Sequence, residues 1–278
     1  MRNIAVRHQF PPLLLPRSLK KIVSGVVLAF LTTPTLAAKQ NQGNVLTLGG
    51  GVDIAPRYSG SDKNRATTAL VLDYSMANGV FISTTRGIGY GNSVGKLDYN
   101  AALSYRVGRK DRDVSSDSLS SGSDDLRGMG DVKGSAIIVP GLGYKVTDWL
   151  SVQLQAEVPV SERNNGEALH FGIISPLYTS PKNSLTLALT TSWGSSKYMQ
   201  TYYGVNAAQS AASGFSRHDA GSGIYAYSLN VDWTHKLTPD WSVAVATGIT
   251  QLTGNAGNSP IVQRKTSPTG SLKVTYSF

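Results

Sequence analysis

Alternation of apolar and polar residues with a period of two dominates the sequence from residue 44 to the C-terminus. In residues 271–278 the apolar positions are Leu272, Val274, Tyr276 and Phe278. In residues 225–237 we expect one side to carry Tyr225, Tyr227, Leu229, Val231, Trp233 and Leu237. Successive side chains of a strand point to opposite faces, so this pattern predicts an all-β chain.

Alternation alone does not separate a β-sandwich from a membrane barrel, because each has one apolar and one polar face. Three features favour the barrel. The alternating segments have the length that a tilted strand needs to cross a bilayer, and short turns alternate with long polar connections. Aromatic residues gather near strand ends, as in an interfacial girdle; they are Tyr144, Trp149, Trp193, Trp241 and Tyr276. We therefore predict a transmembrane antiparallel up-and-down β-barrel.

Turn chemistry predicts the orientation of this barrel. Tight turns at Thr147-Asp148, Pro181–Ser184 and Thr238–Asp240 are expected on the periplasmic side. The long connections, expected outside, lie near residues 108–133, 160–167, 195–222 and 253–266. Residues 134–278 contain seven predicted strands and residues 44–107 contain four strand-like runs. Bacterial single-chain barrels have even counts, so we predict 10–12 strands, with 12 preferred. A strand missing from this count is expected within the glycine-rich residues 86–95.

The N-terminal segment predicts export. Residues 1–38 hold five basic and no acidic residues, then the apolar run IVSGVVLAF, and small residues suited to cleavage at Ala37 or Ala38. The alternative is an N-terminal anchor helix, but the apolar run is too short to span a bilayer. Without residues 1–38 the net charge falls from +9 to +4, so nucleic-acid binding loses its support. We expect a signal peptide at 1–38 and an outer-membrane barrel at 39–278.

Several segments resemble the MipA/OmpV family of outer-membrane proteins, named after the MltA-interacting protein. They occur in order along the mature chain: GGGVDIAPRYSGSD (49–62), STTRGIGY (83–90), YRVGR (105–109), LRGMGDV (126–132), YMQTYYGVNAAQSAASG (198–214), DAG (219–221), DWS (240–242), NSPIV (258–262) and VTYSF (274–278). The segment 198–214, with SPIV downstream, is the most specific. The serine-rich connection 108–133 is longer than expected for the family.

The resemblance implies a non-enzymatic outer-membrane protein of a Gram-negative bacterium. It implies a scaffold that binds a lytic transglycosylase and a peptidoglycan synthase, which is a penicillin-binding protein. Other members imply adhesion as an alternative role. From the residues themselves, a polar lumen keeps a small-solute channel open as a further alternative, and a lipid hydrolase is the least favoured. Outer-membrane lipids and the barrel-assembly machinery are expected partners; Tyr276 and Phe278 at the terminal strand would form the assembly signal.

Two loop segments carry the family motifs. They consist of Tyr202, Tyr203, Gly204 and Val205, and of Ser259, Pro260, Ile261 and Val262. We expect these segments in adjacent outer loops, either as a plug or ligand site in the barrel mouth or packed on each other to seal the barrel top. Both interpretations predict ordered loops.

Catalytic and metal sites have little support in this sequence. Cysteine is absent, which excludes disulfides and thiolate zinc sites. His218 and His235 are the candidate general bases of a hydrolase. The alternative without a catalytic role is that His218 belongs to a polar loop and His235 lies near a strand end. His170 is the remaining mature-chain histidine. Six aspartates in residues 111–131 invite a calcium site, but their spacing fits no EF-hand and a solvated, flexible loop is preferred. We predict no catalytic residue, metal or cofactor.

The polar face of the strands carries charges of both signs. The predicted lumen residues are Arg106, Lys145, Gln153, Gln155, Glu157, Asp232, Lys236 and Lys273. Charges inside a narrow barrel are commonly paired and serve as structure, although a selective channel would use the same residue types.

Overall fold

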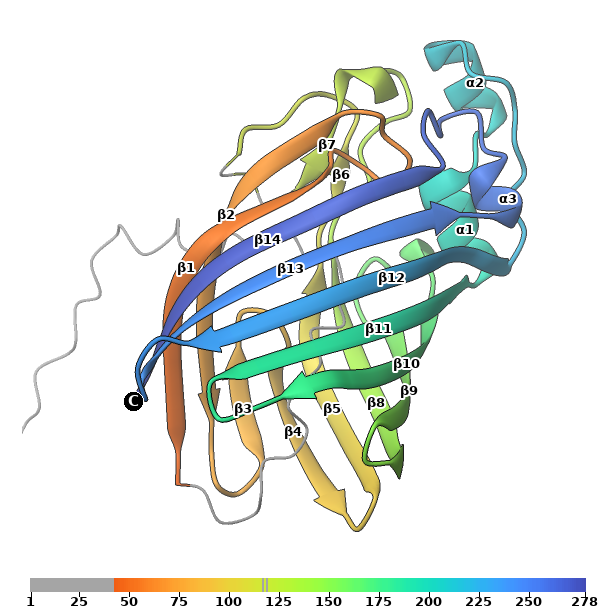
Figure 1. Cartoon of the computed structure of the whole chain (residues 1–278). Coiled ribbons are helices and arrows are strands. Elements are labelled where there is room, and N and C mark those ends of the chain that lie inside the picture. Colours follow the sequence, from red (N-terminus) through yellow and green to blue (C-terminus); the bar gives the residue numbers. More distant parts are fainter. Residues whose placement is uncertain (1–42, 117, 119) are drawn as a thin grey trace, which may run out of the picture.

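The computed structural model describes residues 43–278 except residues 117 and 119. The predicted signal peptide, with Ala37 and Ala38, lies outside the described residues. Twelve antiparallel strands close into one barrel (Figure 1), which confirms the predicted fold and the preferred strand count. The wall strands are β1 (Val45–Pro56), β2 (Asn64–Ser75), β3 (Val80–Ser83), β4 (Gly87–Val94), β5 (Leu97–Arg106), β8 (Ser135–Thr147), β9 (Leu150–Pro159), β10 (Ala168–Thr179), β11 (Asn183–Gly194), β12 (Gly223–Lys236), β13 (Trp241–Leu252) and β14 (Thr266–Ser277).

The remaining elements lie in the loops at one end of the barrel (Figure 1). They are β6 (Arg109–Lys110), β7 (Ser121–Gly122), η2 (Asp124–Leu126), η3 (Arg163–Asn165), α1 (Ser196–Tyr203), α2 (Ala207–Ser213) and α3 (Gly254–Gly257). We call this the loop end, and the opposite end, with the short turns, the turn end. No helix in the described part of the chain is long and apolar enough to cross a membrane.

Consecutive wall strands pair as neighbours, and the first strand closes the barrel on the last. β1 and β14 pair from Thr47 opposite Ser277 to Ile54 opposite Gly270. Closure leaves no free sheet edge along this seam, as a strand structure in lipid requires. The terminal strand is therefore part of the wall over its whole length.

The strand missing from the sequence count lies in the short β3–β4 hairpin. β4 covers most of residues 86–95, where the sequence placed the gap, and pairs with the four-residue β3. Glycines hide this strand from an alternation search because they carry no side chain. They are needed for packing, since a Cβ at Gly87 or Gly89 would come within 2.2–2.3 Å of carbonyl oxygens of β5.

The outer face of the wall is apolar and exposed. On β14, Leu272 and Val274 are 53% and 39% exposed, and on β9 Leu154 is 48% exposed. Aromatic side chains lie at the turn end, where the Tyr276 ring makes edge-to-face contacts with Trp241 and Phe278, with ring centroids 5.1 and 4.7 Å apart. An apolar belt with aromatic residues at its margin is suited to lipid, not to water.

Candidate functional site

The loop end is closed by a helix and by the two family-motif segments. α1 begins after Ser195, whose hydroxyl caps the helix by accepting a hydrogen bond from the backbone N–H of Tyr198. Met199 and Tyr203 of α1 are 0% and 1% exposed. They pack with residues of β12, β13 and α3, namely Tyr225, Ala226, Leu252 and Ala256. The helix thus covers the loop end of the lumen from the inside.

The two motif segments lie against each other, and the first of them begins in the last turn of α1. Ser259 donates a hydrogen bond from its hydroxyl to the Tyr203 carbonyl. Val205 and Ile261 are both fully buried, in a second cluster with Tyr58, Leu126 and Met129. The hydroxyl of Tyr58 donates to the Ile261 carbonyl at 2.9 Å. Four connections of the chain, distant in sequence, therefore share one apolar cluster above the barrel.

Below α1, a buried ion pair joins β5 to β9. Arg106 Nε donates to Glu157 Oε2 at 2.8 Å, and both side chains are about nine-tenths buried. The guanidinium also donates to the Gly166 carbonyl at 2.8 Å and lies 5.0 Å from the ring centroid of Tyr198 on α1. Arg106 therefore connects the wall, the 160–167 loop and the covering helix.

The other carboxylate oxygen of Glu157 faces a histidine that the sequence analysis did not single out as a candidate. His170 Nε2 lies 3.5 Å from Glu157 Oε1, and His170 Nδ1 lies 2.9 Å from Ser192 Oγ. Each pair of neighbours in this row comes from adjacent strands of β9, β10 and β11. The order Ser–His–Glu resembles a catalytic relay. Ser192 is only 6% exposed, however, and Glu157 is already bonded to Arg106.

The predicted candidate bases lie far from this row and from each other. His218 is in the loop end, where its Nε2 lies 2.8 Å from the Asn255 carbonyl. His235 is near the turn end, where its Nδ1 lies 2.8 Å from Asn183 Oδ1. Because the two histidines lie at opposite ends of the barrel, the structure does not bring them together into one site. Neither of the two contacts involves a serine hydroxyl.

Tyr225 was expected on the outer side of its strand, and this expectation is wrong. A β-bulge in β12 lies opposite Ser192 and Trp193 of β11, which pair with Ala226 and Ile224 and leave Tyr225 as the extra residue. The bulge turns Tyr225 inward, where it is 8% exposed and its ring centroid lies 5.1 Å from that of Tyr198. A bulge reverses which face a residue occupies, and period-two counting cannot detect it.

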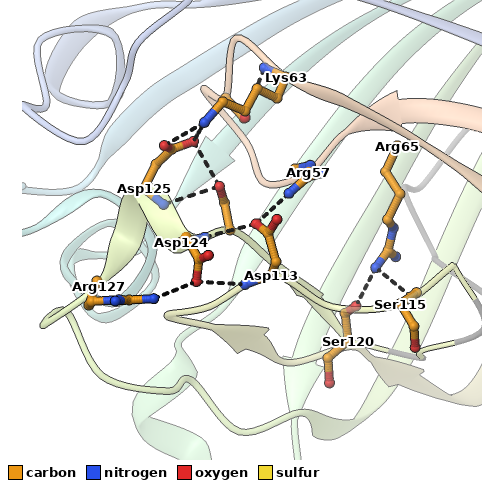
Figure 2. A network of polar contacts seen from close by, with 11 residues as sticks. Arg57, Lys63, Arg65, Asp113, Ser115, Ser120, Asp124, Asp125 and Arg127 are labelled. Atoms are coloured by element: carbon orange, nitrogen blue, oxygen red, sulfur yellow. Dashed lines mark hydrogen bonds and ion pairs between the residues drawn. The ribbon is translucent and has the colours of Figure 1, made fainter.

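The acidic connection between β5 and β8 is held by ion pairs but stays solvated as expected, with Asp113 and Asp124 49% and 53% exposed. Its flexibility stays a prediction. Figure 2 shows Asp113 bonded to Arg57 and Asp125 bonded to Lys63, at 2.7 Å for the latter. Asp124 pairs with Arg127, and Asp131 with Lys110 at 2.8 Å. The aspartates that the sequence offered as calcium ligands are thus paired with cations of the β1–β2 connection (57–63) and of the acidic connection itself. Asp117 is outside the described residues.

Electrostatics at this loop follow from those contacts. The hydrogen bond from Arg57 holds the pKa of Asp113 below its ordinary value, and the hydrogen bond from Lys63 does the same for the pKa of Asp125. The bond from Lys110 lowers the pKa of Asp131. Among the described residues there is no group of three or more His, Cys, Asp or Glu side chains that could hold a metal ion.

The lumen side chains alternate inward as predicted, and four of the inward charges form two ion pairs across strands. Besides Arg106 and Glu157, Lys273 Nζ lies 3.3 Å from Asp53 Oδ1. Lys145 instead bonds Asp148 at 3.1 Å at the turn end. Gln153 lies over Gly172, since a Cβ at Gly172 would come 2.7 Å from Gln153 Cγ. The wall below α1 is therefore polar and close to charge balance.

The turn end has a different character. Its turns at residues 148–149, 180–182 and 237–240 are short, as predicted, and the C-terminal Phe278 is 68% exposed. Phe278 N–H donates to the Leu46 carbonyl at 2.8 Å, which fixes the end of the chain to β1. A role of Tyr276 and Phe278 in barrel assembly stays a prediction.

Solved structures with a similar arrangement include outer-membrane porins. The KdgM porin is 13% identical, with a TM-score of 0.45 over 84% of this chain and 99% of that chain. The NanC porin is 10% identical, with a TM-score of 0.46 over 83% and 98% of the two chains. An OmpT variant from Vibrio cholerae, which lacks loop L8, is 8% identical, with a TM-score of 0.40 over 84% and 98%. No curated protein matches the chain.

A family model identifies the chain more directly. The model described as "MltA-interacting protein MipA" matches residues 48–278, which is nearly the whole described barrel. The resemblance of the motif segments is thereby confirmed. The closed barrel with its apolar outer belt places the protein in the outer membrane. The chain belongs to the MltA-interacting protein MipA family.

Proposed function

We propose that this protein is a scaffold that binds a lytic transglycosylase and a peptidoglycan synthase at the periplasmic face of the outer membrane. The observation that carries the proposal is membership of a family named for interaction with MltA. The protein would act by binding and not by catalysis. In support, His218 and His235 bond to an amide side chain or a carbonyl, and Ser192 is buried below α1.

The turn end is the docking surface that we propose. Short turns suit the periplasmic side of a barrel. Exposed lysines surround this end, at Lys96, Lys145, Lys182 and Lys236, and Asp148 and Asp240 add acidic groups. Among the exposed apolar residues there, Trp149 is 62% and Leu237 54% exposed. A rim of this composition favours a partner with an acidic surface.

The size of the turn end sets the expected strength of the complex. Turns of two to four residues offer a small area, and interfaces under about 1,200 Å² are commonly transient. We therefore expect an association that mild detergent preserves and that cross-linking strengthens. A large permanent interface would need elements that the described turns do not provide.

Affinity capture tests the proposal. The tagged protein, extracted from envelopes in mild detergent, should enrich a lytic transglycosylase and a penicillin-binding protein over an unrelated barrel. Charge reversal at Lys182→Glu with Lys236→Glu should reduce that enrichment about tenfold, because both lysines are at the turn end. The matched control is Arg127→Glu at the loop end, where the side chain is 76% exposed. Equal capture by the two variants, or none by the wild type, would refute docking at this face.

A further inference from the structure

The lumen remains partly open below the loop end. Along β13 the inward residues Ser242, Ala244, Ala246, Gly248 and Thr250 all keep intermediate exposure, whereas Leu252 at the loop end is 3% exposed. Eight strands give a barrel that its own side chains fill, and 16–18 strands leave an aqueous channel. A 12-strand barrel lies between these cases. Closure of this lumen therefore depends on α1 and the loops and not on the wall alone.

α1 is held by two different kinds of contact. On one side, Met199 and Tyr203 pack with the apolar residues Ala226 and Leu252. On the other side the contacts are polar and charged. Arg106 lies over the rings of Tyr198 and Tyr202, and Thr201 donates from its hydroxyl to the Asn164 carbonyl at 2.9 Å. The polar side is the one that water can replace.

Arg109 makes this polar side energetically costly. The residue is 4% exposed and donates to the carbonyls of Tyr202 at 2.7 Å and Thr201 at 3.4 Å, at the C-terminus of α1. The negative end of the helix dipole favours a cation there. Within the described residues, however, Arg109 has no ion pair with a carboxylate, and its Nε has no hydrogen-bond partner. A buried cation compensated only by carbonyls is poorly solvated.

The wall below the helix also contains buried polar atoms that lack a hydrogen-bond partner in the described part of the chain. Arg106 Nη2, Gln153 Nε2 and Thr190 Oγ1 are buried and have no hydrogen-bond partner among the described residues. Such groups are rare in native structures and mark places where packing opposes solvation. Displacement of α1 would admit water to Arg106, whose guanidinium lies over the Tyr198 and Tyr202 rings of α1. The closed arrangement thus carries a penalty that opening relieves.

We propose that α1 is a displaceable plug and that the barrel passes small hydrophilic solutes when α1 leaves the loop end. Selectivity for charge should be weak, because Arg106 is paired with Glu157 and Lys273 with Asp53, and the further inward charges Asp232 and Lys236 are of opposite sign. This function is independent of scaffolding, since it uses the lumen and the loop end, whereas docking uses the turn end.

A disulfide lock tests displacement directly. The chain has no cysteine, so Asn164→Cys with Thr201→Cys would introduce the only two thiols, at residues that a hydrogen bond from the Thr201 hydroxyl to the Asn164 carbonyl brings together. The double-cysteine variant is placed in a planar lipid bilayer bathed in potassium chloride solution. Its current should show brief openings, which oxidation of the thiol pair abolishes and a reductant restores. The two single-cysteine variants are the matched controls and should open like the wild type under both conditions.

A replacement of α1 tests the lumen itself. Exchanging residues 196–203 for glycine and serine should raise the open probability at least about tenfold, because the wall alone does not close a 12-strand barrel. The matched control is the same exchange at α2, residues 207–213, which has no buried residue. Heat-dependent electrophoretic mobility establishes that each variant still forms the barrel.

The two experiments together decide the proposal. A folded barrel without α1 that conducts no more than bare lipid would overturn the channel. A wild type that never opens, or that opens equally when the disulfide is oxidised, would overturn displacement. A reversal potential far from zero in a salt gradient would overturn weak charge selectivity.

Discussion

The strands are connected in different ways at the two ends of the barrel. At the turn end, strands are joined by short turns, and side chains such as Leu237 are more than half exposed. At the loop end, segments from all over the chain share two apolar clusters, and charged groups such as Arg106 are buried. The difference shows that short turns are enough to join the strands of the wall, whereas closing the loop end takes long connections that meet in shared apolar clusters.

The largest difference in stability between the two ends should come from removing a buried ion pair at one and an exposed ion pair at the other. Arg106→Met leaves Glu157 as an uncompensated buried charge, so we expect a loss of about 3–5 kcal/mol in the free energy of unfolding. The double variant with Glu157→Gln should recover part of it. Lys145→Met at the turn end, where the side chain is 52% exposed, should stay within about 0.5 kcal/mol of the wild type. Denaturant titration in detergent, monitored by tryptophan fluorescence, measures all three. Equal losses at the two ends would remove the contrast.

Apolar truncation should separate the ends next. Ile261→Ala empties part of a fully buried cluster, and we expect a loss of about 2–5 kcal/mol. Leu237→Ala at the turn end removes an exposed side chain and should change the stability by less than about 0.5 kcal/mol. Limited proteolysis of the loop end would report the local effect, and thermal unfolding the global one. A stable Ile261→Ala protein with protease-resistant loops would show that the cluster contributes little.

A smaller change, this time a gain in the free energy of unfolding, is expected within β11. Thr190 points into the lumen in the loop-end half of β11, and its hydroxyl has no hydrogen-bond partner among the described residues. Thr190→Val keeps the shape and removes that group, so we expect a gain of about 1 kcal/mol. Thr186→Val, in the turn-end half of the same strand, is the matched control, because Thr186 is partly exposed and should lose nothing or slightly destabilise the wall. A destabilised Thr190→Val protein would contradict the assignment of an unsatisfied group.

The smallest effect concerns pH at the loop end alone. The pKa values of Asp113, Asp125 and Asp131 are lowered by their Arg and Lys partners. Their contribution is therefore complete above the ordinary aspartate pKa, about 4, and is lost as the pH falls through the lowered values. Hydrogen exchange should show weaker protection of residues 108–133 in acid, with the turns at 148–149 and 237–240 unchanged.

Two controls sharpen this pH prediction. Asp113→Asn and Asp125→Asn should weaken the protection at neutral pH and remove part of its pH dependence. Because these pairs are largely exposed, added salt should act in the same direction as acid. Loss of protection that is equal in the mutated and unmutated loop would assign the effect to other groups.

The sequence by itself determined the wall. A period of two, turn residues at fixed places and the length of the alternating runs were enough to predict the closed barrel and its preferred 12 strands, because each of these signals is local. The inward positions of Arg106, Glu157 and Lys273 followed from the same counting. Local signals also located the missing strand, although glycine hid its alternation.

Only the tertiary structure decided what lies inside and above that wall. The row of Glu157, His170 and Ser192 depends on the register of three strands, and Tyr225 turns inward because of one bulge. Asp113 and Asp125 meet Arg57 and Lys63 of the β1–β2 connection, which lie about 50 residues or more away in sequence. Partners so distant leave no mark in a local pattern, because closure of the barrel is what brings them together.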